Sequence, residues 1–272
     1  MEFLTTALKT IGIALKNLFK RDSVTQSAAI AFYAALSLVP LILILLIITN
    51  IFGVDIPRYL VSQIELVAGK DFSSVIEGIV LKTSRNHATG RISFVVASLI
   101  LLFSSTRIFV LIRVYFNRVW EVQRSEKPSF AWIKTHLLSL GMVASGGFLL
   151  LASFLVHTSL SVFLKGFGLF WQMLNFLGAV SLFVLLLTLI FRLLPEAKIP
   201  WRYIFIGSLI TAFLSSLGNY AISMYLKYAG VKSIYGALGS FVVILVWIYY
   251  LTLILFFGAE LMHAYFKRDG RA

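Results

Sequence analysis

The sequence predicts an all-α, polytopic membrane protein with six transmembrane helices, an N-terminal amphipathic helix and a short extracytoplasmic helical hairpin. Of its 272 residues, 60% are hydrophobic and 13% are charged, whereas a soluble domain carries about 25% charged residues. The apolar residues gather in several long blocks, and a helix of about 20 apolar residues spans the hydrocarbon core of a bilayer. Because a helix satisfies its own backbone hydrogen bonds in hydrocarbon, these blocks are expected to be helices and not strands.

The clearest apolar block lies near the end of the chain. No charged residue occurs from 241 to 259, and nearly every residue there is apolar or aromatic. One acid, Glu260, closes the block, and three basic residues, Lys267, Arg268 and Arg271, follow it. The block predicts a span over about residues 240–262 that ends on an acid, and an acid at that depth needs a partner.

Earlier apolar blocks complete the transmembrane domain, which is expected to cover residues 23–272. The other predicted spans are about 28–52, 92–112, 137–156, 173–194 and 203–226. Between the first two spans lies a polar stretch, 53–90, whose apolar residues recur at helical spacing behind capping residues. This stretch is predicted to form the extracytoplasmic helical hairpin.

Residues 1–22 are expected to form a separate amphipathic helix at the cytoplasmic surface. Apolar residues recur at helical spacing, and three lysines fall elsewhere on the helical wheel. The apolar residues are Leu4, Leu8, Ile11, Leu15 and Leu18, and the lysines are Lys9, Lys16 and Lys20. Two interpretations stay open, because such a helix can lie on the membrane surface or pack against the cytoplasmic face of the protein itself.

The basic residues predict the orientation of the spans. Six spans place both termini on one side, and 15 of the 24 lysine and arginine residues lie on that side, against eight on the other. Positively charged loops mark the cytoplasmic side, so the chain is predicted to lie in the bacterial inner membrane with both termini cytoplasmic. The net charge of +13 is then explained by topology and by anionic headgroups.

This distribution also sets the expected partners. We expect membrane phospholipids with anionic headgroups at the cytoplasmic face, and no nucleic acid, because no basic stripe is interleaved with stacking aromatic residues. The sequence leaves open whether the chain forms an oligomer.

Several polar side chains are predicted to lie near the cytoplasmic ends of the spans. Ionisable groups in a membrane are costly and usually pair, so Glu260 is expected to pair with Arg107 or Arg113. This pair could lock two helices together, or the polar group could line a cavity for an anionic headgroup or a coupling ion. Arg107 could also extend to the interface. The candidate substrate or ion-pair residues are Tyr33, Ser104, Arg107, Arg113, Arg192 and Glu260.

Four further residues are structural or hinge candidates. Pro40 lies inside the first predicted span, where it frees a backbone carbonyl and kinks the helix. Asn219 in the fifth span is expected to form interhelical hydrogen bonds. Gly236 and Gly239 lie just before the last span.

Catalytic chemistry has little support in the sequence. The chain has no cysteine, and its four histidines lie in different segments. Glu260 and His263 lie one helical turn apart and could form half of a metal site, but no second pair of ligands completes it. We therefore expect no catalytic residues, no metal, no cofactor and no enzymatic activity.

Three stretches resemble the BrkB/YihY-like family of bacterial inner-membrane proteins, once described as ribonuclease BN. They are SAAIAFYAALSLVPLILIL at 27–45, FRLLPEAKIPWRY at 191–203 and YGALGSFVVILVWIYYLTLILFFGAELMHAY at 235–265. A fourth stretch, SSTRIFVLIRVYFNRVWEV at 104–122, matches in pattern. The resemblance implies six helices in the inner membrane and a role in envelope lipid handling or export. Family-typical positions are Tyr33, Pro40, Arg107, Asn117, Pro195, Pro200, Trp201, Tyr235, Gly236, Gly239, Gly258 and Glu260.

The residues and the resemblance together favour transport or handling of an amphiphilic, anionic, lipid-like substrate. The basic cytoplasmic face and the membrane-embedded arginine would attract such a substrate. The alternative is a non-transporting membrane scaffold or envelope assembly factor, in which the polar residues only join helices.

Overall fold

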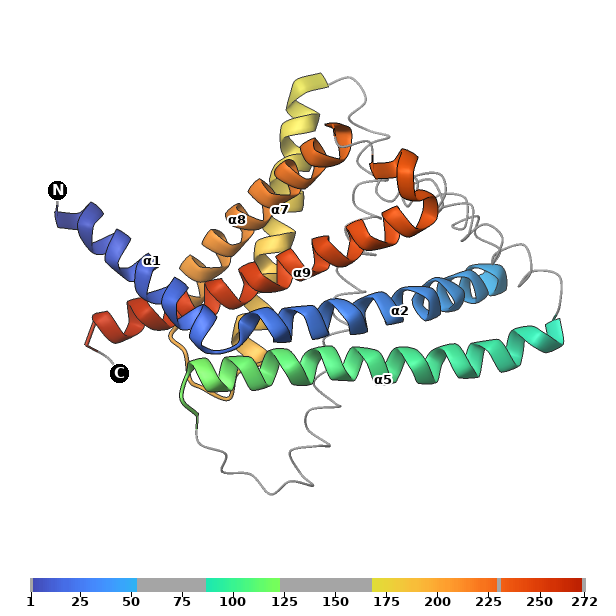
Figure 1. Ribbon diagram of the computed structural model, residues 1–272, viewed down its shortest axis with the longest axis horizontal. Coiled ribbons are helices and arrows are strands. Elements are labelled where there is room, and N and C mark those ends of the chain that lie inside the picture. The colour runs from blue at the N-terminus through green and yellow to red at the C-terminus, as the bar shows by residue number, and fades with distance from the viewer. Residues whose placement is uncertain (1, 53–86, 123–167, 229–230, 271–272) are drawn as a thin grey trace. The chain divides into compact units, whose positions relative to one another are not determined.

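The computed structural model describes residues 2–52, 87–122, 168–228 and 231–270, and every regular element in these ranges is an α-helix (Figure 1). The helices are α1 (Glu2–Lys20), α2 (Ser23–Phe52), α5 (His87–Val119), α7 (Gly168–Leu193), α8 (Trp201–Tyr228) and α9 (Val231–Arg268). This confirms the all-α prediction. The predicted span at 137–156 and the hairpin predicted over 53–90 lie outside the described residues, except that His87 already begins α5.

The five described helices that correspond to predicted spans are all longer than predicted, α5 and α9 by the most. Helix α5 continues through residues 113–119, which were expected to begin a loop. These residues contain neither proline nor glycine, so nothing in their local chemistry ends the helix. Helix α9 begins at Val231 and includes Gly236 and Gly239, which were expected to precede the span.

The chain divides into two compact units, and each is described by itself. Unit 1 comprises Met1–Ser23, Phe109–Ser216 and Ile254–Ala272, and unit 2 comprises Val24–Ile108 and Leu217–Leu253. Helices α5, α8 and α9 therefore contribute residues to both units. Helix α1 belongs to unit 1, so it is part of a packed body.

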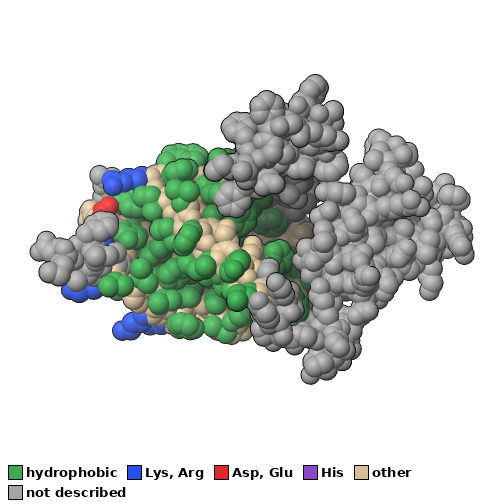
Figure 2. All heavy atoms as spheres, turned by 90° about the horizontal axis from the view of Figure 1, so that it is seen from above, with side chains coloured by type: hydrophobic (Ala, Val, Ile, Leu, Met, Phe, Trp, Pro, Cys, Tyr) green, Lys and Arg blue, Asp and Glu red, His purple; other side chains and the backbone are tan. Residues whose placement is uncertain are grey.

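Three described helices contain stretches that are long and apolar enough to cross a membrane: Val95–Val119, Trp201–Ile222 and Val242–Arg268. The described side chains on the face seen in Figure 2 are mostly apolar, and lysine and arginine side chains gather at one end of it. Large apolar side chains remain exposed on these stretches, for example Leu99 and Phe213. An exposed apolar surface of this kind is typical of helices that contact lipid acyl chains.

Aromatic side chains fill the core of unit 1. Tyr115 on α5 stacks on Phe256 of α9 with 3.8 Å between ring centroids. Phe116 contacts Phe191 of α7 at 5.5 Å and Phe256 at 6.4 Å. All four rings belong to buried residues, and aromatic pairs of this kind add to the stability that burial provides. They fix α5, α7 and α9 around one centre.

Helices α8 and α9 approach closely within unit 1 because small residues lie between them. A Cβ atom on Gly258 of α9 would collide with the Thr211 hydroxyl of α8 and lie 3.2 Å from Cζ of Phe191. A Cβ atom on Gly207 of α8 would collide with the side chain of Met262. Small residues at helix contacts let backbones approach in membrane proteins, which have little hydrophobic drive for helix association.

Unit 2 joins parts of four of the described helices, α2, α5, α8 and α9. Tyr33 of α2 lies edge-on to Phe103 of α5 with 6.4 Å between centroids, which places these helices side by side. Helix α2 runs through Pro40 without interruption. Asn219 Oδ1 of α8 accepts a 2.6 Å hydrogen bond from Trp247 Nε1 of α9. This bond confirms the interhelical hydrogen bonding predicted for Asn219.

Candidate functional site

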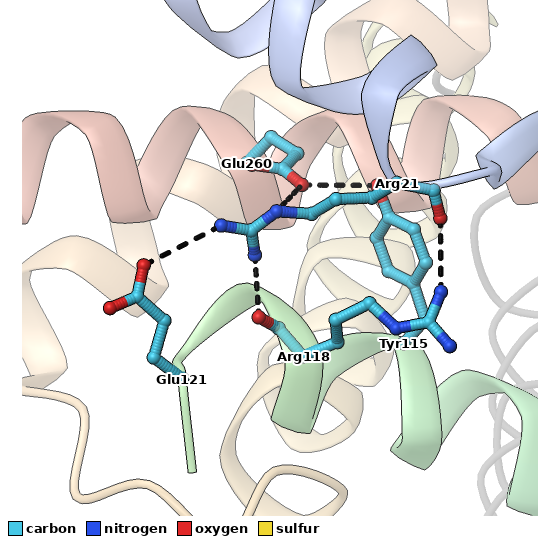
Figure 3. A network of polar contacts seen from close by, with 5 residues as sticks. All are labelled: Arg21, Tyr115, Arg118, Glu121 and Glu260. Carbon is cyan, nitrogen blue, oxygen red and sulfur yellow. Dashed lines mark hydrogen bonds and ion pairs between the residues drawn. The ribbon is translucent and has the colours of Figure 1, made fainter.

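The candidate site is the buried polar network of unit 1 that centres on Glu260 (Figure 3). Glu260 lies on α9, and its side chain is 0% exposed. Its Oε1 accepts a 3.2 Å hydrogen bond from the Tyr115 hydroxyl and lies 3.5 Å from Nε of Arg21. Its other oxygen, Oε2, is buried and has no hydrogen-bond partner among the described residues. One carboxylate oxygen therefore carries the contacts that offset the burial of this acid.

The end of α1 brings Arg21 to this acid. Arg21 donates its backbone N–H to Asn17 O at 3.0 Å, and Asp22 donates to Phe19 O at 3.4 Å. Asp22 has a positive φ of 59°, a conformation that ends a helix and that aspartate tolerates better than most residues. Helix α2 begins directly afterwards at Ser23. This short turn places the Arg21 side chain, 18% exposed, between the surface and Glu260.

Arg21 and Arg118 exchange hydrogen bonds with each other's backbone. Arg21 Nη1 donates to the Arg118 carbonyl at 2.6 Å, and Arg118 Nη1 donates to the Arg21 carbonyl at 3.2 Å. The Arg118 carbonyl lies in the last turn of α5, where carbonyls lack helical partners and cations are favoured. The exchange holds the turn after α1 against the C-terminal end of α5.

The chain leaves α5 through Glu121, which has a positive φ of 53°. Val122 donates to Asn117 O at 2.9 Å and Glu121 donates to Arg118 O at 3.4 Å, the two hydrogen bonds of a Schellman cap. The Glu121 carboxylate is exposed and lies 3.7 Å from Nη2 of Arg21. An exposed ion pair of this kind contributes little to folding stability. The contribution of Arg21 to stability therefore comes mainly from its contact with the buried Glu260.

Another face of α5 holds the segment between α7 and α8. Arg113 forms an ion pair with Glu196, and Asn117 Oδ1, one turn later, accepts a 2.9 Å hydrogen bond from the Glu196 backbone N–H. Arg192 donates to the Ile199 carbonyl at 3.0 Å, and its guanidinium lies 5.2 Å from the Trp201 ring centroid. The segment is thus fixed by charge-assisted hydrogen bonds at both ends.

The predicted partner of Glu260 was wrong. Glu260 pairs with Arg21, whereas Arg113 pairs with Glu196. Successive helix positions turn by about 100°, so residues two apart point roughly 200° apart. Because Tyr115 faces Glu260, Arg113 faces another side of α5.

The structure divides the predicted site residues between the units. Arg113, Arg192 and Glu260 belong to unit 1. The unit 2 residues are Tyr33, Ser104 and Arg107. Ser104 Oγ donates to the Ile100 carbonyl of its own helix at 2.8 Å. Arg107 is exposed, and its guanidinium lies 5.3 Å from the Phe103 ring centroid.

Sequence reasoning missed Arg21, Tyr115 and Arg118. Arg21 was counted only as a basic residue that reports topology. A signal for its role exists in the sequence, because Asp22 and Ser23 directly after it favour a helix end and a new helix start. Tyr115 and Arg118 lie three residues apart on α5, and therefore on neighbouring positions of one helix face.

The suggested half metal site is engaged in other contacts. The His263 ring lies edge-on to Trp120 with 5.2 Å between centroids, and Oε1 of Glu260 contacts Arg21 and Tyr115. In the described ranges no cluster of three or more potential metal ligands forms. The described contacts of Glu260 and His263 are thus an ion pair, a hydrogen bond and a ring contact.

Comparison with known proteins identifies the family. The family described as "Virulence factor BrkB" matches residues 14–271. A UPF0761 membrane protein of Pseudoalteromonas atlantica is 28% identical, with 90% of this chain and 82% of the relative covered. The UPF0761 membrane protein of Cronobacter sakazakii is 26% identical, with 87% of this chain and 81% of the relative covered. A relative from Laribacter hongkongensis is 30% identical, covering 89% of this chain and 58% of the relative.

No solved structure matches the chain. The family match covers both helices that carry the polar network, α5 and α9, as well as the Arg21 turn. The chain therefore belongs to the BrkB family and, like its relatives, is an integral membrane protein.

Proposed function

We propose that this protein transports or handles an anionic, lipid-like amphiphile at the bacterial inner membrane, and that Arg107 contacts the substrate headgroup. The observation that carries the proposal is an exposed arginine on an apolar span. Arg107 lies twelve residues from each end of the apolar stretch Val95–Val119, which corresponds to about 18 Å along the helix. A charge at such a depth is costly unless a counter-charge or water reaches it.

The surroundings of Arg107 support an amphiphilic ligand. Phe103, one turn earlier, is exposed beside the guanidinium, and Leu99 one turn before it is exposed as well. A cation next to an apolar stripe matches a molecule with an anionic headgroup and an acyl chain. The aromatic ring also stabilises the cation while no ligand is present.

The orientation is part of the proposal. The excess of basic residues on the side of the termini supports cytoplasmic termini. The Glu260 network then lies toward the cytoplasmic end of α9, since Glu260 is eight residues from Arg268, the end of that helix. A substrate drawn from the anionic inner leaflet would first meet this side.

We expect Arg107→Gln to reduce the number of anionic phospholipids retained by the purified protein in native mass spectrometry. The glutamine removes the charge and keeps a polar side chain, so the loss reports the electrostatic contact. Arg107→Lys should retain most of the lipid, and Leu99→Ala tests whether loss of exposed bulk on α5 has the same effect. Equal retention by wild type and Arg107→Gln would contradict the headgroup contact.

A non-transporting scaffold is the second candidate. It is favoured by the solid packing around Glu260, where Tyr115 and Phe256 fill the space and leave the acid fully buried. Proteoliposomes with a fluorescent anionic lipid in one leaflet separate the two functions. Protein-dependent movement of this lipid that slows in Arg107→Gln supports transport, whereas no movement above empty vesicles supports the scaffold.

A further inference from the structure

From Leu8 to Lys20, where burial on α1 is described, one face of the helix is buried in unit 1. Thr10, Ala14 and Leu18 are buried, with 0–3% of each residue exposed. They lie four residues apart and form one stripe along the helix. This stripe, together with Arg21, fixes the position of α1. It differs from the apolar face read from the sequence: Leu18 of that face is buried, whereas Leu8, Ile11 and Leu15 are exposed.

A second line of apolar residues on α1 points outward. Leu8 is 66% exposed and Phe19 is 64% exposed, and Leu15 lies between them and is exposed too. Their spacing of seven and four residues places them on one line along the helix. The outer apolar stripe is therefore defined by Leu8, Leu15 and Phe19.

A row of lysines borders the outer apolar stripe. Lys9, Lys16 and Lys20 are exposed, and each follows one member of the stripe by one residue. One residue turns the helix by about 100°, so the lysine row runs parallel to the outer apolar stripe over the same length. The helix thus has a packed face, an apolar face and a basic face.

We propose that the outer apolar stripe and the lysine row of α1 dock on the interface of an anionic bilayer. Apolar side chains enter the boundary of the acyl chains while the lysines contact headgroup phosphates, the pattern of an interfacial helix. Charge complementarity selects anionic lipid as the occupant, because three lysines flank the stripe and no acidic residue occurs from Thr5 to Lys20. With cytoplasmic termini, the docking surface is the inner leaflet.

This surface goes beyond the proposed function, because it concerns unit 1 and does not involve Arg107. Docking of α1 on lipid would also affect the Glu260 network. Arg21 follows the lysine row directly and contacts Glu260 at 3.5 Å. Lipid that positions α1 therefore also positions the partner of the buried acid on α9.

The test uses the absence of cysteine from the chain. Gly12→Cys gives a unique site for a nitroxide label between the stripe and the lysine row, and a Cβ there meets nothing within 4 Å. The full-length protein is placed in nanodiscs of zwitterionic lipid alone or of zwitterionic lipid mixed with anionic phosphatidylglycerol, which gives the surface the negative potential of a cytoplasmic leaflet. Collision rates with oxygen and with a water-soluble nickel complex report the immersion of the label.

Two reference positions and one variant complete the design. A label at Gly178→Cys on α7, where a Cβ is also unobstructed, serves as the apolar reference. A label at Lys198→Cys, which is exposed between α7 and α8, serves as the aqueous reference. The variant replaces Lys9, Lys16 and Lys20 with glutamine, and its thermal midpoint checks that the fold is kept.

We expect anionic lipid to lower nickel access at Gly12→Cys several-fold relative to Lys198→Cys, and the glutamine variant to lose most of this change. Each lysine near an anionic surface contributes about fivefold in binding. Nickel access equal to the aqueous reference in both lipids would overturn the proposal. Equally low nickel access in zwitterionic and anionic nanodiscs would also overturn the proposal. Spin–spin broadening of the label spectrum would show instead that this face of α1 contacts a second copy of the chain. Repeating the measurement with Arg107→Gln separates this result from the proposed function, because that variant should leave α1 docking unchanged.

Discussion

We expect Arg21→Met to lower the thermal midpoint of the purified protein by about 10 °C, the larger of the two expected stability effects in the polar network. Among the described residues, the substitution leaves the fully buried Glu260 carboxylate with the Tyr115 hydroxyl as its one partner. Removing one partner of a buried ion pair costs about 3–5 kcal/mol of folding free energy. For a chain of this size, each kcal/mol lowers the thermal midpoint by about 2–4 °C. Thermal unfolding in detergent measures the change.

The converse substitution should cost less. Glu260→Gln keeps an acceptor for the Tyr115 hydroxyl, and the Arg21 side chain is 18% exposed and can still contact water and Glu121. Arg202→Met removes an exposed arginine at the start of α8 and serves as the matched control. If Arg21→Met and Arg202→Met unfold at the same temperature, Arg21 does not hold Glu260.

The second large effect is expected at the contact of α8 with α9. Gly258→Ala introduces a Cβ that collides with the Thr211 hydroxyl and lies 3.2 Å from Phe191 Cζ. Added atoms in a packed core cost about 1–3 kcal/mol, more than the helix propensity that alanine gains over glycine, about 1 kcal/mol. The thermal midpoint should fall although alanine favours helices.

A second substitution should restore stability at this contact. Thr211→Ala removes the colliding hydroxyl, and the new Cβ would then lie 3.4 Å from the Thr211 Cβ, an ordinary contact. The double variant Gly258→Ala/Thr211→Ala should therefore be more stable than Gly258→Ala alone. Gly178→Ala on α7 meets nothing within 4 Å and should not lower the midpoint. A Gly258→Ala protein that is as stable as Gly178→Ala would exclude close packing of α8 on α9.

The helices could be predicted because their apolar blocks are long. The uncharged stretch before Glu260 lies within α9, and the N-terminal periodic segment forms α1. The ends of the helices were less predictable. Helix α5 continues to Val119 because polar side chains do not end a helix, whereas the positive φ at Glu121 does. A glutamate in that conformation carries no local signal in the sequence, since glycine is the residue that normally adopts it.

The site was predicted in part. The sequence showed that Glu260 needs a cationic partner, because an isolated acid in hydrocarbon is costly. It could not choose among the arginines, since the choice depends on which face of α5 meets α9 and on where α1 packs. Tyr115 decides the first and the buried stripe of Thr10, Ala14 and Leu18 decides the second. Both are tertiary contacts between segments far apart in the sequence.

The most direct test of the Glu260 network is a double-mutant cycle on the thermal stability of the full-length protein, with Arg21→Met, Glu260→Gln and the combination of the two. Residues in direct contact within a buried network show coupling energies of about 0.5–3 kcal/mol, whereas distant residues are additive. We expect the double variant to be more stable than Arg21→Met alone, because it removes the uncompensated carboxylate. Purely additive losses of stability would contradict the pairing of Arg21 with Glu260.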